Sequence, residues 1–123
     1  MRILLVDENR RTRELFRAIL ADAGHTVAAT ASYPQATELL YHHPFDLVVS
    51  EIQGSEGEQH RFASVLRRRP GLPVILHTAW PSTVQSRLDR LARQRMEKRT
   101  DFRPLLQAVD SSSGWQTVRG RTA

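Results

Sequence analysis

The feature that most constrains the fold is a fivefold alternation of short apolar segments with longer amphipathic ones. The apolar segments are rich in branched residues and are bounded by charge, glycine or proline, as buried β-strands are. In the amphipathic segments apolar residues recur at helical spacing, as Phe16, Ile19 and Leu20 do. The patterns predict strands at 2–6, 25–30, 45–50, 72–78 and 95–98, and helices at 10–23, 33–42, 57–69, 82–92 and 101–110.

This alternation predicts the α/β class, with a doubly wound, five-stranded parallel sheet in a (βα)5 arrangement. Right-handed crossovers then place helices on both faces of the sheet. Residues 1–110 are predicted to form the domain and residues 111–123 a flexible C-terminal tail, with Trp115 the only residue able to anchor it. In sheets of this kind binding sites form beyond the carboxyl ends of the strands, so the residues there are the first candidates for function.

Acidic, hydroxyl and ammonium groups gather at this edge of the predicted sheet. Asp7 and Glu8 follow the first strand, Glu51 follows the third, Thr78 ends the fourth and Lys98 ends the fifth. Clustered carboxylates repel one another unless a cation or a proton relieves them, and hard oxygen ligands suit Mg²⁺. A hydroxyl and an ammonium suit phosphate oxygens. The set therefore indicates magnesium-assisted phosphoryl chemistry.

Four strings in this order resemble the response-regulator receiver domain, which a sensor histidine kinase phosphorylates on an aspartate. They are “ILLVDEN”, “FDLVVSE”, “LPVILHTA” and “MEKRTDFRPLLQAV”, and the resemblance covers residues 1–110. It implies a flavodoxin-like sheet with strand order 2-1-3-4-5. It also implies that Glu51 stands at the phosphoacceptor position and that the metal-ligand positions are Asp7, Glu8, Glu51 and Gln53. The switch and phosphate-contact positions are Thr78, Ala79 and Lys98.

The chain departs from the family first at Glu51, where the family has aspartate. A glutamate is longer by one methylene, and in-line attack tolerates little displacement, so we expect normal phosphorylation to be lost or very slow. The longer side chain also carries its charge toward the place of an aspartyl phosphate, within reach of Lys98 and Thr78. Family precedent suggests that such a glutamate imitates the phosphorylated state imperfectly.

Further departures concern the moving parts of the family's switch. The loop “IQGSEG” after Glu51 lacks the usual proline, and Gln53 falls where a backbone carbonyl completes the metal site. Arg99 follows Lys98 where proline is typical. Arg95 takes the place of a tyrosine or phenylalanine that rotates on phosphorylation, although the stem of an arginine can still pack there. Mg²⁺ thus stays a candidate cofactor, bound weakly or absent.

The leading interpretation is an atypical receiver, or pseudo-receiver, in two-component or phosphorelay signalling. It would act by protein–protein contact, independently of normal aspartyl phosphorylation, and not as an enzyme, because no base and nucleophile pair is visible. The expected partner is a histidine kinase or a downstream effector, with an acidic protein or a second copy of the chain as options. The contact face would comprise the helix at 82–92, the fifth strand and the last helix, which carry Arg87, Arg90, Arg93, Arg95, Arg99 and Arg103.

Two alternatives stay open. One is a conventional receiver that retains Mg²⁺-dependent phosphotransfer with Glu51 tolerated. The other is an arginine-rich nucleic-acid-binding protein, which a net charge of +5 favours. The arginines are scattered and lack interleaved aromatics, however, so nucleic acid is not an expected partner. No apolar run approaches the ~20 residues that span a bilayer, and no signal-peptide pattern precedes Asp7, so we expect a cytoplasmic protein without membrane contact.

Overall fold

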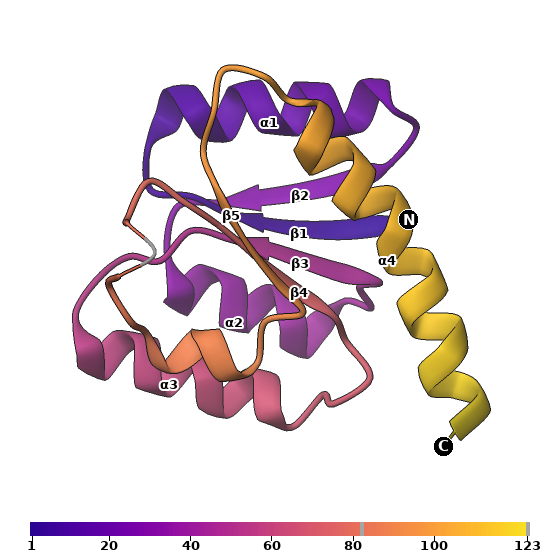
Figure 1. The fold of residues 1–123 in the computed structure, drawn as a ribbon. Helices are drawn as coiled ribbons and strands as arrows, with labels where there is room; N and C mark the ends of the chain where they lie inside the picture. The colour runs from indigo at the N-terminus through magenta and orange to yellow at the C-terminus, as the bar shows by residue number, and fades with distance from the viewer. Residues whose placement is uncertain (82, 123) are drawn as a thin grey trace.

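Five parallel strands form the central sheet of the computed structural model, which describes residues 1–81 and 83–122 (Figure 1). Their spatial order is β2-β1-β3-β4-β5. The predicted class, the parallel sheet and its strand order are thereby confirmed. The strands are β1 (Arg2–Val6), β2 (Thr26–Thr30), β3 (Leu47–Ser50), β4 (Val74–Thr78) and β5 (Gln94–Glu97).

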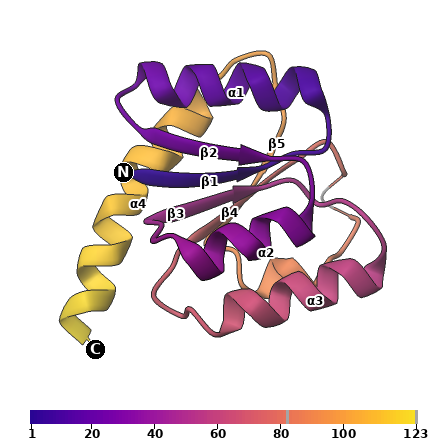
Figure 2. The ribbon, with the colours of Figure 1, turned by 180° about the vertical axis from the view of Figure 1, so that it is seen from behind.

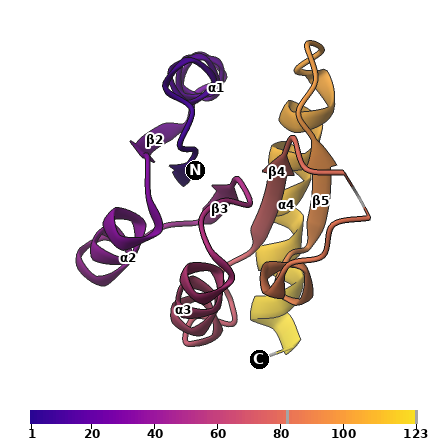
Figure 3. The same cartoon turned by 90° about the vertical axis from the view of Figure 1, so that its left-hand side faces the viewer.

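The alternation of side chains along β1 explains why helices cover both faces of the sheet. Ile3 and Leu5 contribute to one core and Leu4 and Val6 to the other, and all four are buried. The first face is covered by α1 (Arg10–Asp22) and α4 (Arg103–Thr122), and the second by α2 (Tyr33–His42) and α3 (Glu56–Arg67) (Figures 2 and 3). Within the described residues, no helix combines the length and the apolar composition needed to cross a bilayer.

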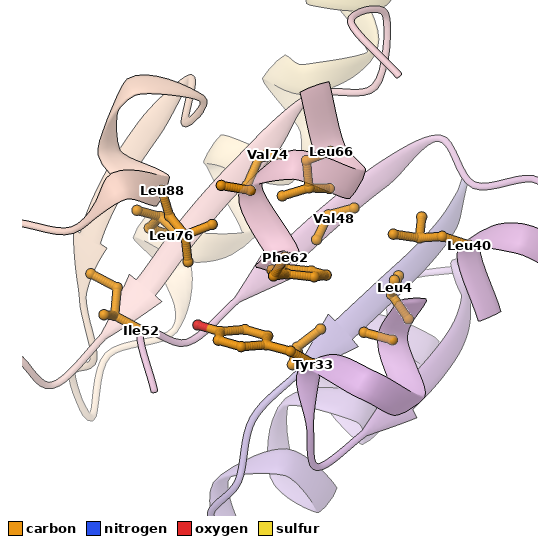
Figure 4. Close-up of a cluster of buried hydrophobic side chains, with 13 residues drawn as sticks. Leu4, Tyr33, Leu40, Val48, Ile52, Phe62, Leu66, Val74, Leu76 and Leu88 are labelled. Carbon is orange, nitrogen blue, oxygen red and sulfur yellow. The ribbon is translucent and has the colours of Figure 1, made fainter. Parts of the chain in front are cut away.

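Each face of the sheet therefore has its own hydrophobic core. Phe16, Leu105 and Val109 pack between the sheet and the α1–α4 layer. On the other face Tyr33 stacks on Phe62, with ring centroids 4.4 Å apart and planes 12° from parallel (Figure 4). Because both faces are packed, the carboxyl ends of the strands are held in fixed relative positions.

The prediction of a helix at 82–92 is wrong over residues 83–92, the part of this range that the structure describes. That part contains a single 3₁₀ turn, η1 (Arg87–Arg90). The physical reason lies in β5, where the guanidinium of Arg95 donates to the carbonyl oxygens of Pro81 and Val84, both at 2.7 Å. These bonds tie the segment to β5 along a path that a continuous helix would not follow. The fourth helix of the (βα)5 pattern is thus reduced to one turn.

The last helix is longer than predicted. The structure continues α4 to Thr122, where the sequence pattern predicts a flexible tail from residue 111. Ser112 is fully buried. Trp115 is half-buried against the α1–α4 core, and the guanidinium of Arg93 lies 5.5 Å from the centre of its ring. Trp115 therefore packs this segment onto the sheet, while the division into residues 1–110 and 111–123 stays a prediction.

A histidine is buried in the α1–α4 core. His77, in β4, is 5% exposed, and its ring lies 4.6 Å from that of Phe16 in an edge-to-face arrangement. Burial, and then the nearby ammonium of Lys98, lower the pKa of His77 to about 4, although Asp7 acts in the opposite direction. The imidazole is therefore neutral in the folded chain at neutral pH.

This burial predicts a specific acid sensitivity. Below pH 6.5 the unfolded chain binds a proton at His77 that the folded chain excludes, so the free energy of unfolding decreases as the pH drops toward 4. The full loss is about 3 kcal/mol. We expect denaturant titrations between pH 7 and 4 to show that His77→Leu removes this part, whereas His60→Gln, at an exposed position, keeps it. Equal acid sensitivity of the wild type and His77→Leu would contradict the prediction.

Candidate functional site

The acids and the lysine predicted for the site meet at one edge of the sheet. In Figure 1 the arrowheads of β1, β2 and β3 point to the left-hand side, and Figure 3 looks at the molecule from that side. At this edge the amides of Asp7, Glu51 and Lys98 donate to carbonyl oxygens of neighbouring strands at 2.8 to 3.0 Å. Strand pairing thus continues for one residue beyond β1, β3 and β5 and sets where the three side chains begin.

Lys98 lies between two buried carboxylates. Its Nζ is 2.7 Å from Oδ2 of Asp7 and forms a second ion pair with Oε2 of Glu51. The side chains of Asp7, Glu51 and Lys98 are 3%, 8% and 14% exposed, so water screens their charges little. Burial alone would lower the pKa of Lys98, but its hydrogen bonds to Asp7 and Glu51 outweigh burial and raise the pKa above its ordinary value. The ammonium therefore stays charged.

Backbone and hydroxyl donors complete the surroundings of both acids. Asp7 accepts from the amide of Asn9 and the hydroxyl of Thr12, each at 2.9 Å. Glu51 accepts from the amide of Ile52 at 3.0 Å through Oε1, the oxygen that Lys98 does not bind. Each carboxylate oxygen of the pair thus has a donor among the described residues. A further cation would have to share these oxygens with the ammonium and the other donors.

Glu8 and Gln53, the other two predicted metal ligands, do not join this pair. Glu8 is exposed, and its backbone amide donates to Oε1 of Gln53 at 3.0 Å. The side-chain amide of Gln53 donates to the carbonyl oxygen of Ala31 at 2.8 Å. Gln53 therefore braces the loops that follow β1, β2 and β3 against one another. Its role as a metal ligand stays a prediction.

Tyr33 is a residue of the site that the sequence did not reveal. Its hydroxyl donates to the carbonyl oxygen of Glu51 at 2.8 Å and accepts from the amide of Gln53 at 3.1 Å. Burial raises the pKa of Tyr33 to about 12, so the phenol keeps the proton that it donates. The sequence indicates Tyr33 only as the first residue of a helix, and no local pattern shows that its ring reaches the loop after β3.

Lys98 contacts Glu51 as predicted, but the hydroxyl of Thr78 has a different partner. Thr78 is fully buried, and its hydroxyl accepts from the amide of Trp80 at 3.0 Å, its only side-chain hydrogen bond to a described residue. Ala79 is exposed next to it. The phosphate-contact roles of Thr78 and Ala79 stay predictions.

Arg95 holds the segment between β4 and β5 in place. Its guanidinium pairs with Asp89 at 3.0 Å and donates to the carbonyl oxygens of Trp80, Pro81 and Val84, at 3.4, 2.7 and 2.7 Å. The side chains of the ion pair are 19% and 29% exposed. Arg95 thus binds several groups of this segment at once, and its equivalence to a rotating aromatic ring stays a prediction.

Most of the arginines predicted for a contact face are paired within the chain. Among the described residues Arg90 forms no ion pair. The other five have these partners: Arg87 with Glu56 (4.0 Å), Arg93 with the Trp115 ring (5.5 Å), Arg95 with Asp89 (3.0 Å), Arg99 with Glu97 (3.7 Å) and Arg103 with Asp101 (2.8 Å).

The residues present do not fit a three-carboxylate Mg²⁺ site in this arrangement. Among the described residues, no three or more histidine, cysteine, aspartate or glutamate side chains gather closely enough to hold a metal ion. Asp7 and Glu51 do lie together, but the positive charge between them is the ammonium of Lys98. A divalent cation would have to displace Lys98 or share its oxygens against like-charge repulsion.

Comparison with known proteins identifies the class. The family model of the response regulator receiver domain matches residues 3–110. The chain is 34% identical over 80 residues to the response regulator protein FleR of Pseudomonas aeruginosa. The aligned region covers 64% of this chain and 17% of FleR. The chain thus spans less than a fifth of the length of this curated relative.

Solved receiver structures have the same fold. The response regulator TrrA of Thermotoga maritima, in complex with Mg²⁺ and BeF, aligns with a TM-score of 0.80 at 23% identity over 90% of this chain and 97% of TrrA. TrrA in complex with the histidine kinase ThkA aligns with a TM-score of 0.78 at 23% identity over the same shares. The chain belongs to the response regulator receiver domain family of two-component signalling. Members of this family are generally non-enzymatic signalling modules.

The ion cluster predicts a strong and pH-dependent effect of losing Lys98. In Lys98→Met two buried carboxylates remain without a counter-ion, which costs about 3–5 kcal/mol of stability at neutral pH. Because protonation of one carboxyl relieves the repulsion, we expect the loss to be smaller at pH 5 than at pH 8 in denaturant titrations. Adding Glu51→Gln to Lys98→Met should recover part of the loss. A pH-independent loss, or no recovery in the double variant, would contradict the cluster.

Proposed function

We propose that the chain is an atypical receiver, a pseudo-receiver, that acts through protein–protein contact independently of normal aspartyl phosphorylation. The single observation that carries this proposal is the ion cluster, in which the carboxylate at the phosphoacceptor position is already bound by Lys98. The proposal concerns this domain, and the activity of any longer protein that contains it is a separate matter.

The geometry of Glu51 disfavours it as a nucleophile. Attack on phosphorus needs a carboxylate oxygen that is accessible and aligned in line with the leaving group. In Glu51 one oxygen accepts from the amide of Ile52, the other binds Lys98, and the residue is 7% exposed. To react, it would have to break an ion pair in a poorly solvated place, which is costly.

The same contacts support imitation of a phosphorylated state. In the family the lysine at the position of Lys98 contacts the phosphoryl group, and here the longer side chain of Glu51 brings a negative charge to that lysine. The imitation is partial, because one carboxylate has less charge and fewer oxygens than a phosphate. Mg²⁺ would bind weakly or not at all, since the ammonium already neutralises part of the charge of the two acids.

A protein partner follows from this reading of the site. The proposed partner is a histidine kinase or a downstream effector with an acidic surface, and a second copy of the chain is the other option. The exposed arginines of η1 favour an acidic partner, because they carry positive charge that the domain leaves largely uncompensated.

Phosphorylation with a small phosphodonor tests the proposal directly. We expect intact-mass measurement after incubation with acetyl phosphate and Mg²⁺ to show no phosphoryl group on the wild type or on the control variant Glu51→Gln. Glu51→Asp should gain one phosphoryl group, because the shorter side chain withdraws from Lys98 and restores the ordinary acceptor.

The outcomes separate the readings. A wild type that gains a phosphoryl group at Glu51, labile to alkali and to hydroxylamine as an acyl phosphate is, would show a conventional receiver and overturn the proposal. If Glu51→Asp also stays unmodified, the site has lost phosphotransfer for reasons beyond residue 51, and the domain acts as a docking module only.

A further inference from the structure

A polar cleft lies between α3 and η1, away from the ion cluster. Its volume is about 540 Å³, which is within the range of sites for small molecules. Gln85 and Ser86, before η1, form one wall, and Glu56, Gln59 and Arg67 of α3 form another. Figure 3 shows α3 and its neighbouring segments from the side of the strand ends. Its charged lining residues are Glu56, Arg67, Arg87 and Arg90, so arginines outnumber the single acid, and Gln59, Trp80 and Ser86 line it as well.

Unpaired positive charge gathers at this cleft. Arg67 and Arg90 form no ion pair with any described residue, and the single ion pair of Arg87 is a 4.0 Å approach to Glu56, whose side chain is 84% exposed. Three guanidinium groups that line one cleft repel one another, and an anion would relieve the repulsion. Guanidinium groups bind phosphate oxygens through paired hydrogen bonds better than any other side chain.

A hydrogen-bond network holds the walls of the cleft in place. Asp89 binds Arg95 and also accepts from the amide of Ser86 at 2.7 Å. The hydroxyl of Ser86 donates to Oε1 of Gln59 at 2.7 Å, so the segment before η1 is joined to α3. Gln59, 5% exposed, donates in turn to the carbonyl oxygen of Gly54 at 3.4 Å. The cleft is therefore formed before a ligand arrives, which lowers the entropic cost of binding.

Trp80 gives the cleft a flat apolar surface. It is half-buried, packs against the core between the sheet and the α2–α3 layer, and is the only aromatic residue among the described residues that line the cleft. Its backbone is fixed by the hydrogen bond from its amide to the hydroxyl of Thr78. Stacking on an aromatic side chain is how proteins bind nucleobases without reading their edges. A ring for stacking beside guanidinium groups for phosphate is the chemistry that a nucleotide requires.

We propose that this cleft binds a free nucleotide, with the base against Trp80 and the phosphate at Arg67, Arg87 and Arg90. The cleft is small and local, since the described residues that line it come from α3, η1 and the loops beside them. This size favours a single nucleotide over a nucleic-acid strand. The site goes beyond the proposed signalling function and does not depend on the chemistry at Glu51, although it uses Arg87 and Arg90, which also belong to the proposed partner surface.

Calorimetric titration of the full chain tests the site. We use GMP and AMP as probes, and guanosine and inorganic phosphate as the two halves of the ligand. We expect the monophosphates to bind at least about tenfold more tightly than either half, because each half engages only one part of the cleft. Trp80→Leu should weaken the monophosphates and leave inorganic phosphate unchanged.

Charge-matched variants separate the cleft from general electrostatics. Arg67→Gln/Arg90→Gln should raise the Kd of the monophosphates by about tenfold or more, whereas Arg10→Gln/Arg11→Gln, an equal change of charge on exposed residues of α1, should leave it within about twofold. All four arginines are exposed, so the folds of both variants should survive, and thermal unfolding checks this. Three results would overturn the proposal: no binding of either monophosphate, equal weakening by both double variants, or much tighter binding of a single-stranded oligonucleotide or an acidic peptide.

Discussion

The ion cluster of Asp7, Lys98 and Glu51 is the interaction on which the site depends. It joins the ends of β1, β3 and β5, although β3 and β4 lie between β1 and β5 in the sheet. A buried ion pair contributes little to net stability, yet the removal of one partner leaves an uncompensated charge. The cluster is therefore a constraint on the relative positions of strand ends more than a source of folding energy. Glu51 acts here first as an internal counter-ion.

Arg95 plays a similar part on the other side of the sheet edge. Its guanidinium binds Asp89 and the carbonyl oxygens of the segment before η1. One cation therefore fixes a segment for which the sequence pattern predicts a helix. An aromatic ring that rotates exchanges between two packed positions. A guanidinium with several hydrogen bonds can leave its position only if all of those bonds break together. Arg95 thus holds the segment before η1, and Lys98 holds the ends of β1 and β3.

Periodicity in the sequence predicts the strands, four of the five helices and the meeting of Asp7, Glu51 and Lys98, because these follow from local patterns and from the geometry of parallel sheets. The same reasoning failed at 82–92, where apolar residues at helical spacing are present but bonds from Arg95 decide the path. It also missed the hydroxyl of Tyr33, which contacts residues far along the chain. Long-range contacts of single side chains leave no periodic signal, so they become visible only in the folded structure.

The length of the side chain at residue 51 and the position of Lys98 together determine whether their charged groups meet. Nζ of Lys98 contacts Asp7, and the backbone amide of Lys98 is held by the carbonyl oxygen of Thr78, the last residue of β4. The carboxylate of Glu51 reaches the same ammonium from the end of β3. This contact supports the proposal that the glutamate at residue 51 serves as a partner of the lysine and not as a phosphoacceptor. The charges of the two acids and the lysine are thus satisfied within the chain, which is why the proposed function places signalling at the surface of the domain.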